Sequence, residues 1–211
     1  YVVMAALLCS RKMHRTFSAQ ARKVWEPETT PLAPDVTVGI MGMGVLGRAC
    51  AGALRGMGYN VIGWSRTPKE FDDVQNFDGL DGLEKFLPRT QILVCLLPLT
   101  AETEGILGRG TFNRLPAGAA VINVGRGGHM VEDELIVALD KGKVEVAVLD
   151  VFNEEPLPVD HALWDHPRVF LTPHIASVTT PESAIISVAE AVNELRKGLP
   201  LTNLVDTTLG Y

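Results

Sequence analysis

The sequence of 211 residues lacks a long apolar run, a surplus of positive charge and a dense set of cysteines. No stretch reaches the roughly 18 apolar residues of a transmembrane helix, so no membrane span is predicted. Lys and Arg number 19 against 25 Asp and Glu, a net charge of −6, which leaves no general basic surface for a nucleic-acid partner. Only 6% of the residues are aromatic, yet 46% are hydrophobic, which is typical of a soluble globular protein and excludes a disordered one.

The cysteines Cys9, Cys50 and Cys95 are odd in number and lie far apart in apolar stretches. This usage favours a reducing compartment, and Cys95 is expected to be a buried strand residue and not a nucleophile. We therefore predict a cytoplasmic location, with an organellar matrix as the alternative. No His or Cys spacing fits a zinc site, so no metal is predicted.

Residues 1–25 carry five basic residues and no acidic one. The apolar run at residues 1–9 precedes the basic residues, which is the reverse of a secretory signal. An organellar transit segment would fit the composition, but the chain does not begin with Met. We predict one helix that packs on another part of the protein, because Val3, Leu7 and Leu8 recur at roughly helical spacing.

Alternating strand and helix patterns begin after an extended linker at residues 26–35, which holds three prolines. The predicted strands are 36–41, 60–64, 92–96, 120–123, 146–150 and 169–171. The predicted helices are 45–57, 80–87, 111–115, 132–141 and 181–197. Continuous apolar strands are typical of a parallel sheet covered on both faces. The predicted fold is therefore a doubly wound α/β (Rossmann) domain over residues 36–198, followed by a tail at 199–211.

A glycine pattern follows the first predicted strand directly and opens the first helix of that domain. Gly42, Gly44 and Gly47 form G-x-G-x-x-G, and this context is the one that dinucleotide binding requires. Glycines let the backbone turn tightly and approach a pyrophosphate, while the helix N-terminus supplies N–H donors. The alternative is a turn made only for close packing of strand and helix.

The end of the second predicted strand indicates which nucleotide is preferred. No acid stands there to accept a hydrogen bond from a ribose 2′-hydroxyl, and the sequence is Ser65-Arg66-Thr67. A hydroxyl beside a guanidinium suits a 2′-phosphate, because Arg binds phosphate through charge-assisted hydrogen bonds. We predict NADP(H) as the preferred cofactor, with NAD(H) as the alternative. If these residues bind no ligand, they form a solvated turn at the surface.

Four further motifs follow the ends of predicted strands, where open α/β sheets bind their ligands. They are Leu97–Thr103, Asn123–Gly128, Leu149–Pro156 and Thr172–Ala176. In order and spacing, together with the glycine turn, they resemble the D-isomer-specific 2-hydroxyacid dehydrogenase family along the whole chain. The resemblance implies an oxidoreductase that transfers a hydride from NADPH to a small 2-keto acid such as glyoxylate or hydroxypyruvate.

The resemblance also implies roles for individual residues. His174 matches the family's acid/base, Glu155 the acid that orients it, with Glu154 as the rival, and Arg126 the cation that holds the substrate's carboxylate and carbonyl. Asp150 would contact the nicotinamide carboxamide, and Thr103 a phosphate or ribose. The predicted cofactor-binding set is Gly42, Gly44, Val45, Leu46, Gly47, Ser65, Arg66, Thr67, Leu97, Pro98, Thr103, Val124, Gly125, Arg126, Asp150, His174 and Ala176.

Members of the family have a substrate domain and a nucleotide-binding domain. We expect this sequence to contain only the nucleotide-binding domain. We therefore expect the chain to bind NADP(H) but to reduce keto acids poorly by itself. The resemblance implies a homodimer formed through the nucleotide-binding domain and the helix of residues 1–25, and a tail that returns toward the substrate domain. Two alternatives stay open: a dehydrogenase of another 2-hydroxy acid, such as a phosphoglycerate type, and a non-catalytic, NAD(P)-sensing corepressor-like module.

Overall fold

The computed structural model describes residues 1–201 and 204, and within them the strands form one seven-stranded parallel sheet. Its order is β3-β2-β1-β4-β5-β6-β7, so the winding direction reverses between β1 and β4. The strands are β1 (Thr37–Met41), β2 (Asn60–Ser65), β3 (Gln75–Asp78), β4 (Ile92–Cys95), β5 (Ala119–Asn123), β6 (Val144–Leu149) and β7 (Val169–Leu171). This is the doubly wound fold that the sequence predicts, and the reversal opens a ligand crevice above β1 and β4.

The strand β3 is absent from the six predicted strands. Its sequence is Gln-Asn-Phe-Asp, and none of its four residues is fully buried. It lies at the edge of the sheet and pairs only with β2, from Ile62 opposite Gln75 to Ser65 opposite Asp78. An edge strand with little burial does not need an apolar run, so hydrophobicity alone could not reveal it.

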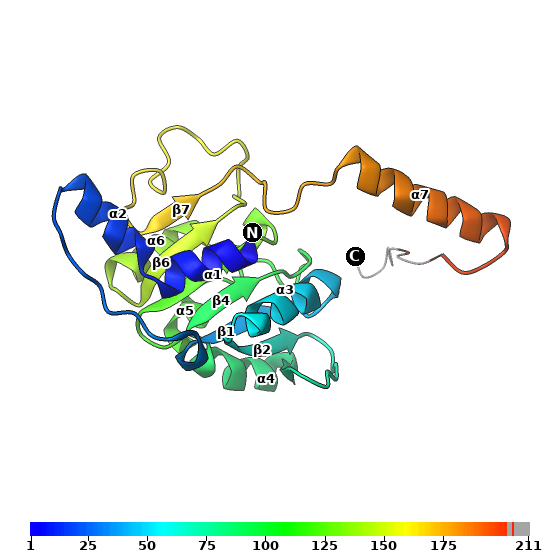
Figure 1. Ribbon diagram of the computed structural model, residues 1–211, viewed down its shortest axis with the longest axis horizontal. Coiled ribbons are helices and arrows are strands. Elements are labelled where there is room, and N and C mark those ends of the chain that lie inside the picture. Colours follow the sequence, from blue (N-terminus) through cyan, green and yellow to red (C-terminus); the bar gives the residue numbers. More distant parts are fainter. Residues whose placement is uncertain (202–203, 205–211) are drawn as a thin grey trace.

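Helices cover both faces of the sheet, and Figure 1 shows α1 and α3 crossing the face nearest the viewer. The helices of the described residues are α1 (Val2–Ser10), α2 (Met13–Ala21), α3 (Val45–Gly56), α4 (Gly79–Phe86), α5 (Arg109–Arg114), α6 (Glu132–Asp140) and α7 (Pro181–Arg196), of which α7 does not cover the sheet. The same part of the chain contains three short 3-10 turns, η1 (Ala33–Asp35), η2 (Leu87–Arg89) and η3 (Gly127–His129). The turn η1 lies inside the stretch predicted to be an extended linker.

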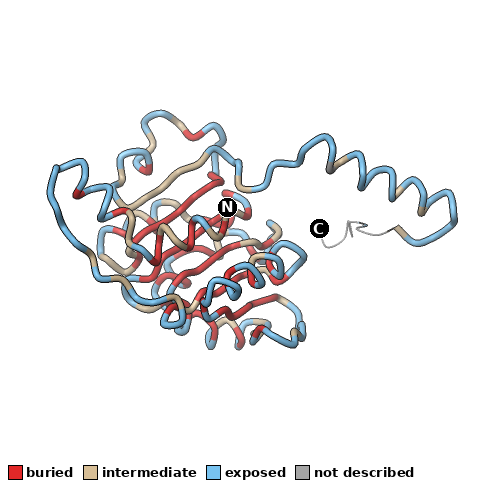
Figure 2. Tube along the Cα trace, viewed as in Figure 1, coloured by how far each residue is buried: buried red, intermediate tan, exposed pale blue. Residues whose placement is uncertain are grey.

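The core has two apolar layers, because successive strand residues point to opposite faces. On β1, the side chains of Val38 and Ile40 belong to the layer that packs against α1 and α3. The side chain of Met41 belongs to the other layer, which also contains Phe86 of α4 and Phe112 of α5. Figure 2 shows the strands as the most continuously buried segments. Cys95 is fully buried, as expected, and burial raises the pKa of its thiol to about 12.

The single helix expected over residues 1–25 is in fact two helices. Lys12 takes a left-handed backbone conformation with φ of 50°, which ends α1 and redirects the chain into α2. The buried side of α1 is also not the predicted one, because Ala5 and Ala6 are 0% exposed while Leu7 and Leu8 are only half-buried. Small side chains let α1 approach the sheet closely, so the packing stripe favours Ala over Leu.

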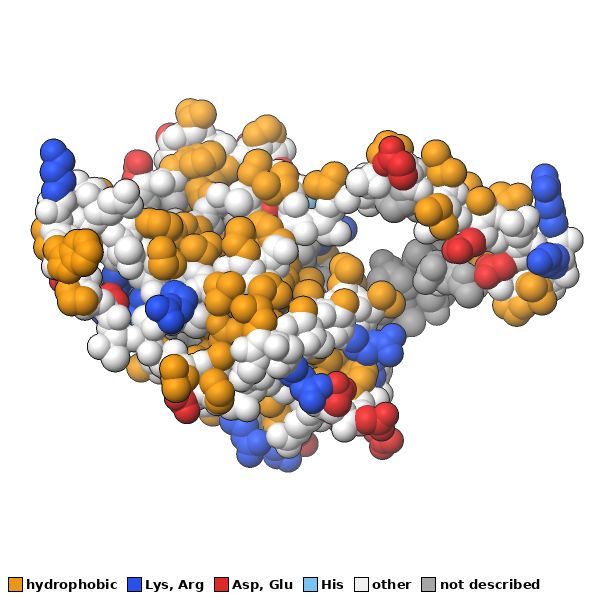
Figure 3. Space-filling view, in the orientation of Figure 1, with side chains coloured by type: hydrophobic (Ala, Val, Ile, Leu, Met, Phe, Trp, Pro, Cys, Tyr) orange, Lys and Arg blue, Asp and Glu red, His pale blue; other side chains and the backbone are white. Residues whose placement is uncertain are grey.

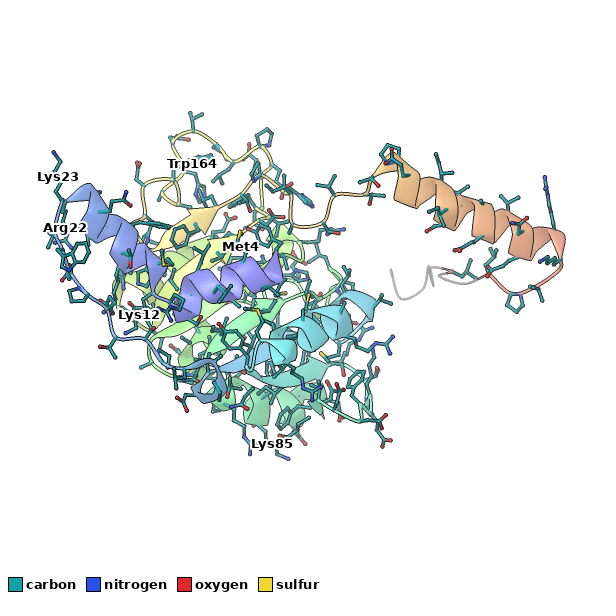
Figure 4. The ribbon with its side chains drawn as sticks, viewed as in Figure 1. Met4, Lys12, Arg22, Lys23, Lys85 and Trp164 are labelled. Carbon is teal, nitrogen blue, oxygen red and sulfur yellow. The ribbon has the colours of Figure 1, made fainter. Side chains whose placement is uncertain are left out.

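The basic residues of the first segment are largely paired with acids. Arg15 contacts Glu145 of β6 at 2.7 Å and Glu28 at 3.1 Å. His14, a buried residue of α2, has its Nε2 atom 3.0 Å from the same Glu145 carboxylate. Figure 4 shows Lys12 and Lys23 near the two ends of α2. The positive segment is therefore a docked structural element, neutralised by residues that follow it.

The last helix, α7, lies apart from the sheet and its covering helices (Figure 1). Most of its side chains are exposed, including those of Ile185, Ile186 and Val188. The predicted returning tail falls largely on residues 202–203 and 205–211, outside the described part of the chain. In the described part, none of the helices has the length and apolarity to cross a membrane.

Candidate active site

The three glycines of the turn between β1 and α3 serve different purposes. Gly42 has φ of 103°, a conformation that side chains disfavour. A Cβ on Gly47 would lie 2.0 Å from the carbonyl oxygen of Gly42, so the start of α3 packs directly on the turn. A Cβ on Gly44 would meet nothing within 4 Å. Gly42 and Gly47 therefore shape the turn, whereas the open space at Gly44 faces the cleft.

A cleft of about 540 Å³ lies at the carboxyl edge of the sheet, at the switch point between β1 and β4. Its size is that of a typical small-molecule site. The first turn of α3 lines this cleft. Because the helix begins there, the N–H groups of Val45, Leu46 and Gly47 have no carbonyl partner within the helix. Such N–H groups, with the helix dipole, favour a phosphate there.

Most of the predicted cofactor-binding residues line this cleft. They are Gly42, Gly44, Val45, Leu46, Gly47, Ser65, Arg66, Thr67, Leu97, Pro98, Thr103, Val124, Gly125 and Arg126. Asp150, His174 and Ala176 do not line it, because they lie farther along the same sheet edge, after β6 and β7. The residues present therefore fit the phosphate and ribose portions of a dinucleotide.

The turn after β2 presents cations to the cleft. Arg66 and Lys69 both line it, and Lys69 is absent from the sequence prediction. The Arg66 guanidinium donates to the Glu102 carboxylate at 3.0 Å, which links the turn after β2 to the loop after β4. Ser65, in contrast, is buried: its hydroxyl donates to the carbonyl of Thr67 and accepts from Asn76. Ser65 thus shapes the turn, and the positive charges that the turn brings to the cleft are those of Arg66 and Lys69.

The loop after β4 is held by its own side chains. The buried hydroxyl of Thr103 donates to the carbonyl of Pro98 at 2.7 Å and accepts from the N–H of Thr100 at 2.8 Å. These bonds close the loop after β4, whose residues from Leu96 to Thr100 also line the cleft. Thr103 therefore has a structural task in addition to the predicted contact with a phosphate or ribose.

Asp150 anchors the loop after β7. Its carboxylate, 1% exposed, accepts hydrogen bonds from the hydroxyl of Thr172 and from the N–H groups of Ile175 and Ala176, the last two at 2.9 and 2.8 Å. Its carbonyl oxygen accepts from the N–H of His174 at 2.8 Å. The loop wraps around this one residue, and the predicted contact of Asp150 with a carboxamide stays a prediction.

His174 and Glu155 come together from separate loops. The Nδ1 atom of His174 lies 2.8 Å from Oε2 of Glu155, and the other carboxylate oxygen accepts from the N–H of Phe152 at 2.9 Å. Burial opposes ionisation of Glu155 most strongly, but these two hydrogen bonds and the charges of His174 and Arg126 outweigh it and lower its pKa. Within the described part of the chain, the rival Glu154 makes no such hydrogen bond to His174.

The backbone of His174 is strained, with φ of 55°, which is uncommon for a residue with a side chain. Such strain persists only where the surroundings impose it and is found at functional sites. Here the bonds to Asp150 impose it, and the result aims the imidazole at Glu155. A carboxylate accepts only, so Nδ1 carries a proton and Nε2 is the nitrogen left for a substrate.

Arg126 links the cleft to this pair. It follows β5, lines the cleft, and donates from Nη1 to the carbonyl of Gly125 at 2.7 Å. Its positive charge also contributes to the lowered pKa of Glu155. The three predicted catalytic residues thus gather at one edge of the sheet. Such a grouping of a fixed cation, a proton-carrying imidazole and its carboxylate suits the reduction of a carbonyl next to a carboxylate.

Comparison with known proteins defines the class. Residues 3–176 match the family described as D-isomer specific 2-hydroxyacid dehydrogenase, NAD binding domain. The match covers most of the sequence, so the chain belongs to this family of NAD(P)-dependent oxidoreductases. The resemblance drawn from the four motifs and the glycine turn is confirmed.

Particular relatives are similar over the whole of this chain. The glyoxylate/hydroxypyruvate reductase A of Yersinia enterocolitica is 44% identical over 211 residues, which are 100% of this chain and 67% of the relative. A probable 2-hydroxyacid dehydrogenase of Rhizobium etli, solved with NADP, HEPES and L(+)-tartaric acid, has 40% identity and a TM-score of 0.95, covering 100% of this chain and 68% of that one.

A third relative is an NADPH-dependent glyoxylate/hydroxypyruvate reductase of Sinorhizobium meliloti, solved with NADP and sulfate. Its identity is 41% and its TM-score 0.93, with 100% of this chain and 68% of that chain covered. The sequence thus spans about two thirds of the length of these relatives.

Because Gly44 and Gly47 have different tasks, adding a methyl group should affect NADPH binding at one position and stability at the other. Gly44→Ala should leave the free energy of unfolding nearly unchanged but weaken NADPH binding at least about tenfold, because the methyl group enters the cleft. Gly47→Ala should lower the free energy of unfolding by about 1–3 kcal/mol, since it overpacks the turn. Urea unfolding and NADPH fluorescence titration of both variants check this. Weaker folding of the Gly44 variant would contradict the assignment.

Proposed function

We propose that this chain binds NADP(H) and supplies the proton donor and the carboxylate-binding cation for the reduction of a small 2-keto acid, glyoxylate or hydroxypyruvate, to its 2-hydroxy acid. The observation that carries the proposal is the hydrogen bond between Nδ1 of His174 and the Glu155 carboxylate at 2.8 Å, beside a cleft that Arg126 lines. The names of the Yersinia and Sinorhizobium relatives support the choice of substrates.

The chemistry divides between the cofactor and the chain. NADPH, when bound, supplies the hydride that adds to the carbonyl carbon of the substrate. His174, held at Nδ1 by Glu155, donates the proton at Nε2 to the oxygen on which negative charge develops. Glu155 stabilises the imidazolium that this step requires. Arg126 holds the substrate's carboxylate as a fixed, always charged fork.

The preference for NADP(H) rests on the turn after β2. Arg66 and Lys69 place two positive charges beside the cleft, where an NAD-specific site would place an acid for the ribose hydroxyls. Glu102 already offers the Arg66 guanidinium a carboxylate at 3.0 Å, in the role that a 2′-phosphate would take over. The relatives solved with NADP support the same preference.

The paired His174 and Glu155 also favour an enzyme over a non-catalytic nucleotide sensor, because reduction of a carbonyl requires an oriented proton donor. Reduction of a different 2-keto acid is the remaining enzymatic alternative. Assays with several keto acids decide between these substrates.

We further propose a homodimer that pairs through the exposed side of α1. Apolar side chains gather over α1 in Figure 3, and Met4 there is 46% exposed. The half-buried Val3 and Leu7 extend this surface. A cytoplasmic location stays a prediction from the sequence.

The role of His174 predicts a selective loss of turnover. The assay follows oxidation of NADPH by the chain fused behind the substrate domain of the Yersinia relative, because the chain spans 67% of that protein. His174→Gln should lower kcat by roughly 10²–10⁴-fold and leave NADPH affinity within about threefold. The matched variant His166→Gln, in a turn before β7, should keep its kcat. Retained turnover in the His174 variant would refute the proposal.

The role of Arg66 predicts a change in cofactor preference. Arg66→Gln should weaken NADPH binding by roughly 10- to 100-fold, since a charge-assisted bond is lost, and leave NADH binding within about twofold. Fluorescence titration of the 211-residue chain with both cofactors measures this, with Arg114→Gln on α5 as the control. Equal changes for the two cofactors would show that Arg66 does not read the 2′-phosphate.

A further inference from the structure

His129, which no motif assigned a role, lies between two walls of the cleft. It ends η3 and is 0% exposed. Its Nδ1 atom lies 3.0 Å from the backbone nitrogen of Arg126, and its Nε2 atom lies 3.2 Å from the carbonyl oxygen of Pro98. One imidazole therefore contacts both the loop after β4 and the loop after β5.

The two partners fix the protonation of this ring. The carbonyl of Pro98 only accepts, so Nε2 must carry the hydrogen. The N–H of Arg126 only donates, so Nδ1 must be bare. The neutral Nε2–H tautomer alone satisfies both contacts. Burial lowers the pKa of His129 and so keeps the ring neutral, with Arg126 as the nearby charge.

The backbone around His129 fixes the position of its imidazole ring. A Cβ on Gly125 would lie 2.9 Å from Nδ1, so the imidazole packs directly on that glycine. The carbonyl oxygen of His129 accepts from the N–H of Leu107 at 2.8 Å, which ties the residue to the segment before α5. The ring is thus a rigid spacer between Pro98 and Arg126.

We propose that His129 is a positioning residue that acts through both nitrogens: Nδ1 sets the backbone of Arg126 for the substrate's carboxylate, and Nε2–H sets the Pro98 loop against the cofactor. The assignment to substrate and cofactor rests on the proposed function. The two contacts belong to different nitrogens, so they are separable by substitution, which a residue that only fills the core would not allow.

Two substitutions each keep one contact. His129→Asn places an amide near the position of Nδ1 and keeps an acceptor for Arg126, but it cannot reach Pro98. His129→Gln extends an amide toward the position of Nε2 and keeps the donor for Pro98, but it leaves Arg126 without its acceptor. The matched control is His161→Asn, because the Nδ1 atom of His161 also accepts a backbone N–H, from Leu163, away from the cleft.

Hydrogen exchange at the Arg126 amide and NADPH fluorescence titration read the two contacts separately in the 211-residue chain. The Gln variant should speed exchange of the Arg126 amide at least about tenfold and leave NADPH affinity within about twofold. The Asn variant should keep the amide protected and weaken NADPH binding by about tenfold. The His161 control should change neither. Equal effects of both variants on both readouts, or no effect, would overturn the proposal.

The tautomer gives a test that needs no variant. Long-range ¹H–¹⁵N spectra of the wild-type chain should show His129 as the neutral Nε2–H form, and an Nδ1–H form would overturn the proposal even if a variant failed to fold. If the wild-type chain does not bind NADPH, the proposed function fails. The amide exchange and the tautomer would still decide the role of His129.

Discussion

The buried carboxylate of Asp150 is the constraint on which the catalytic edge depends. A charge that is 1% exposed is costly unless hydrogen bonds saturate it, and here the donors come from one loop, at Thr172, Ile175 and Ala176. If the loop moved away, the buried carboxylate would lose its hydrogen-bond donors, which is energetically unfavourable. The strained backbone of His174 is therefore maintained by a residue that need not take part in the proton transfer.

Asp150 is also linked, through Thr172, to the residue that precedes α1. The Thr172 hydroxyl donates to Asp150, so its contact with the hydroxyl of Tyr1 must be made with Tyr1 as the donor. Burial raises the pKa of that Tyr1 hydroxyl, which keeps it protonated and able to donate. The sheet brings the strand ends to one edge, and these bonds join α1 to the loop that carries His174. The helix at residues 2–10 is thus part of the support of the site, in addition to covering a face of the sheet.

Hydrophobic runs and glycine motifs predicted the architecture well, because buried parallel strands leave a plain signal in sequence. They missed the polar edge strand β3 and the break at Lys12, where a left-handed residue carries no such signal. The motifs singled out Arg126, Glu155 and His174, which the fold gathers at one edge. His129 escaped notice because its contacts join segments 31 residues apart, and only the folded chain shows them.

Hydrogen exchange at the amides of Ile175 and Ala176 tests the hold of Asp150 most directly. Both donate to its carboxylate, and an Asp150→Asn side chain keeps only one oxygen to accept from them. The variant should speed exchange at these amides at least about tenfold while the amides of β6 stay protected. Unchanged exchange at Ile175 and Ala176, or an equal loss of protection throughout β6, would contradict a carboxylate that holds the catalytic loop.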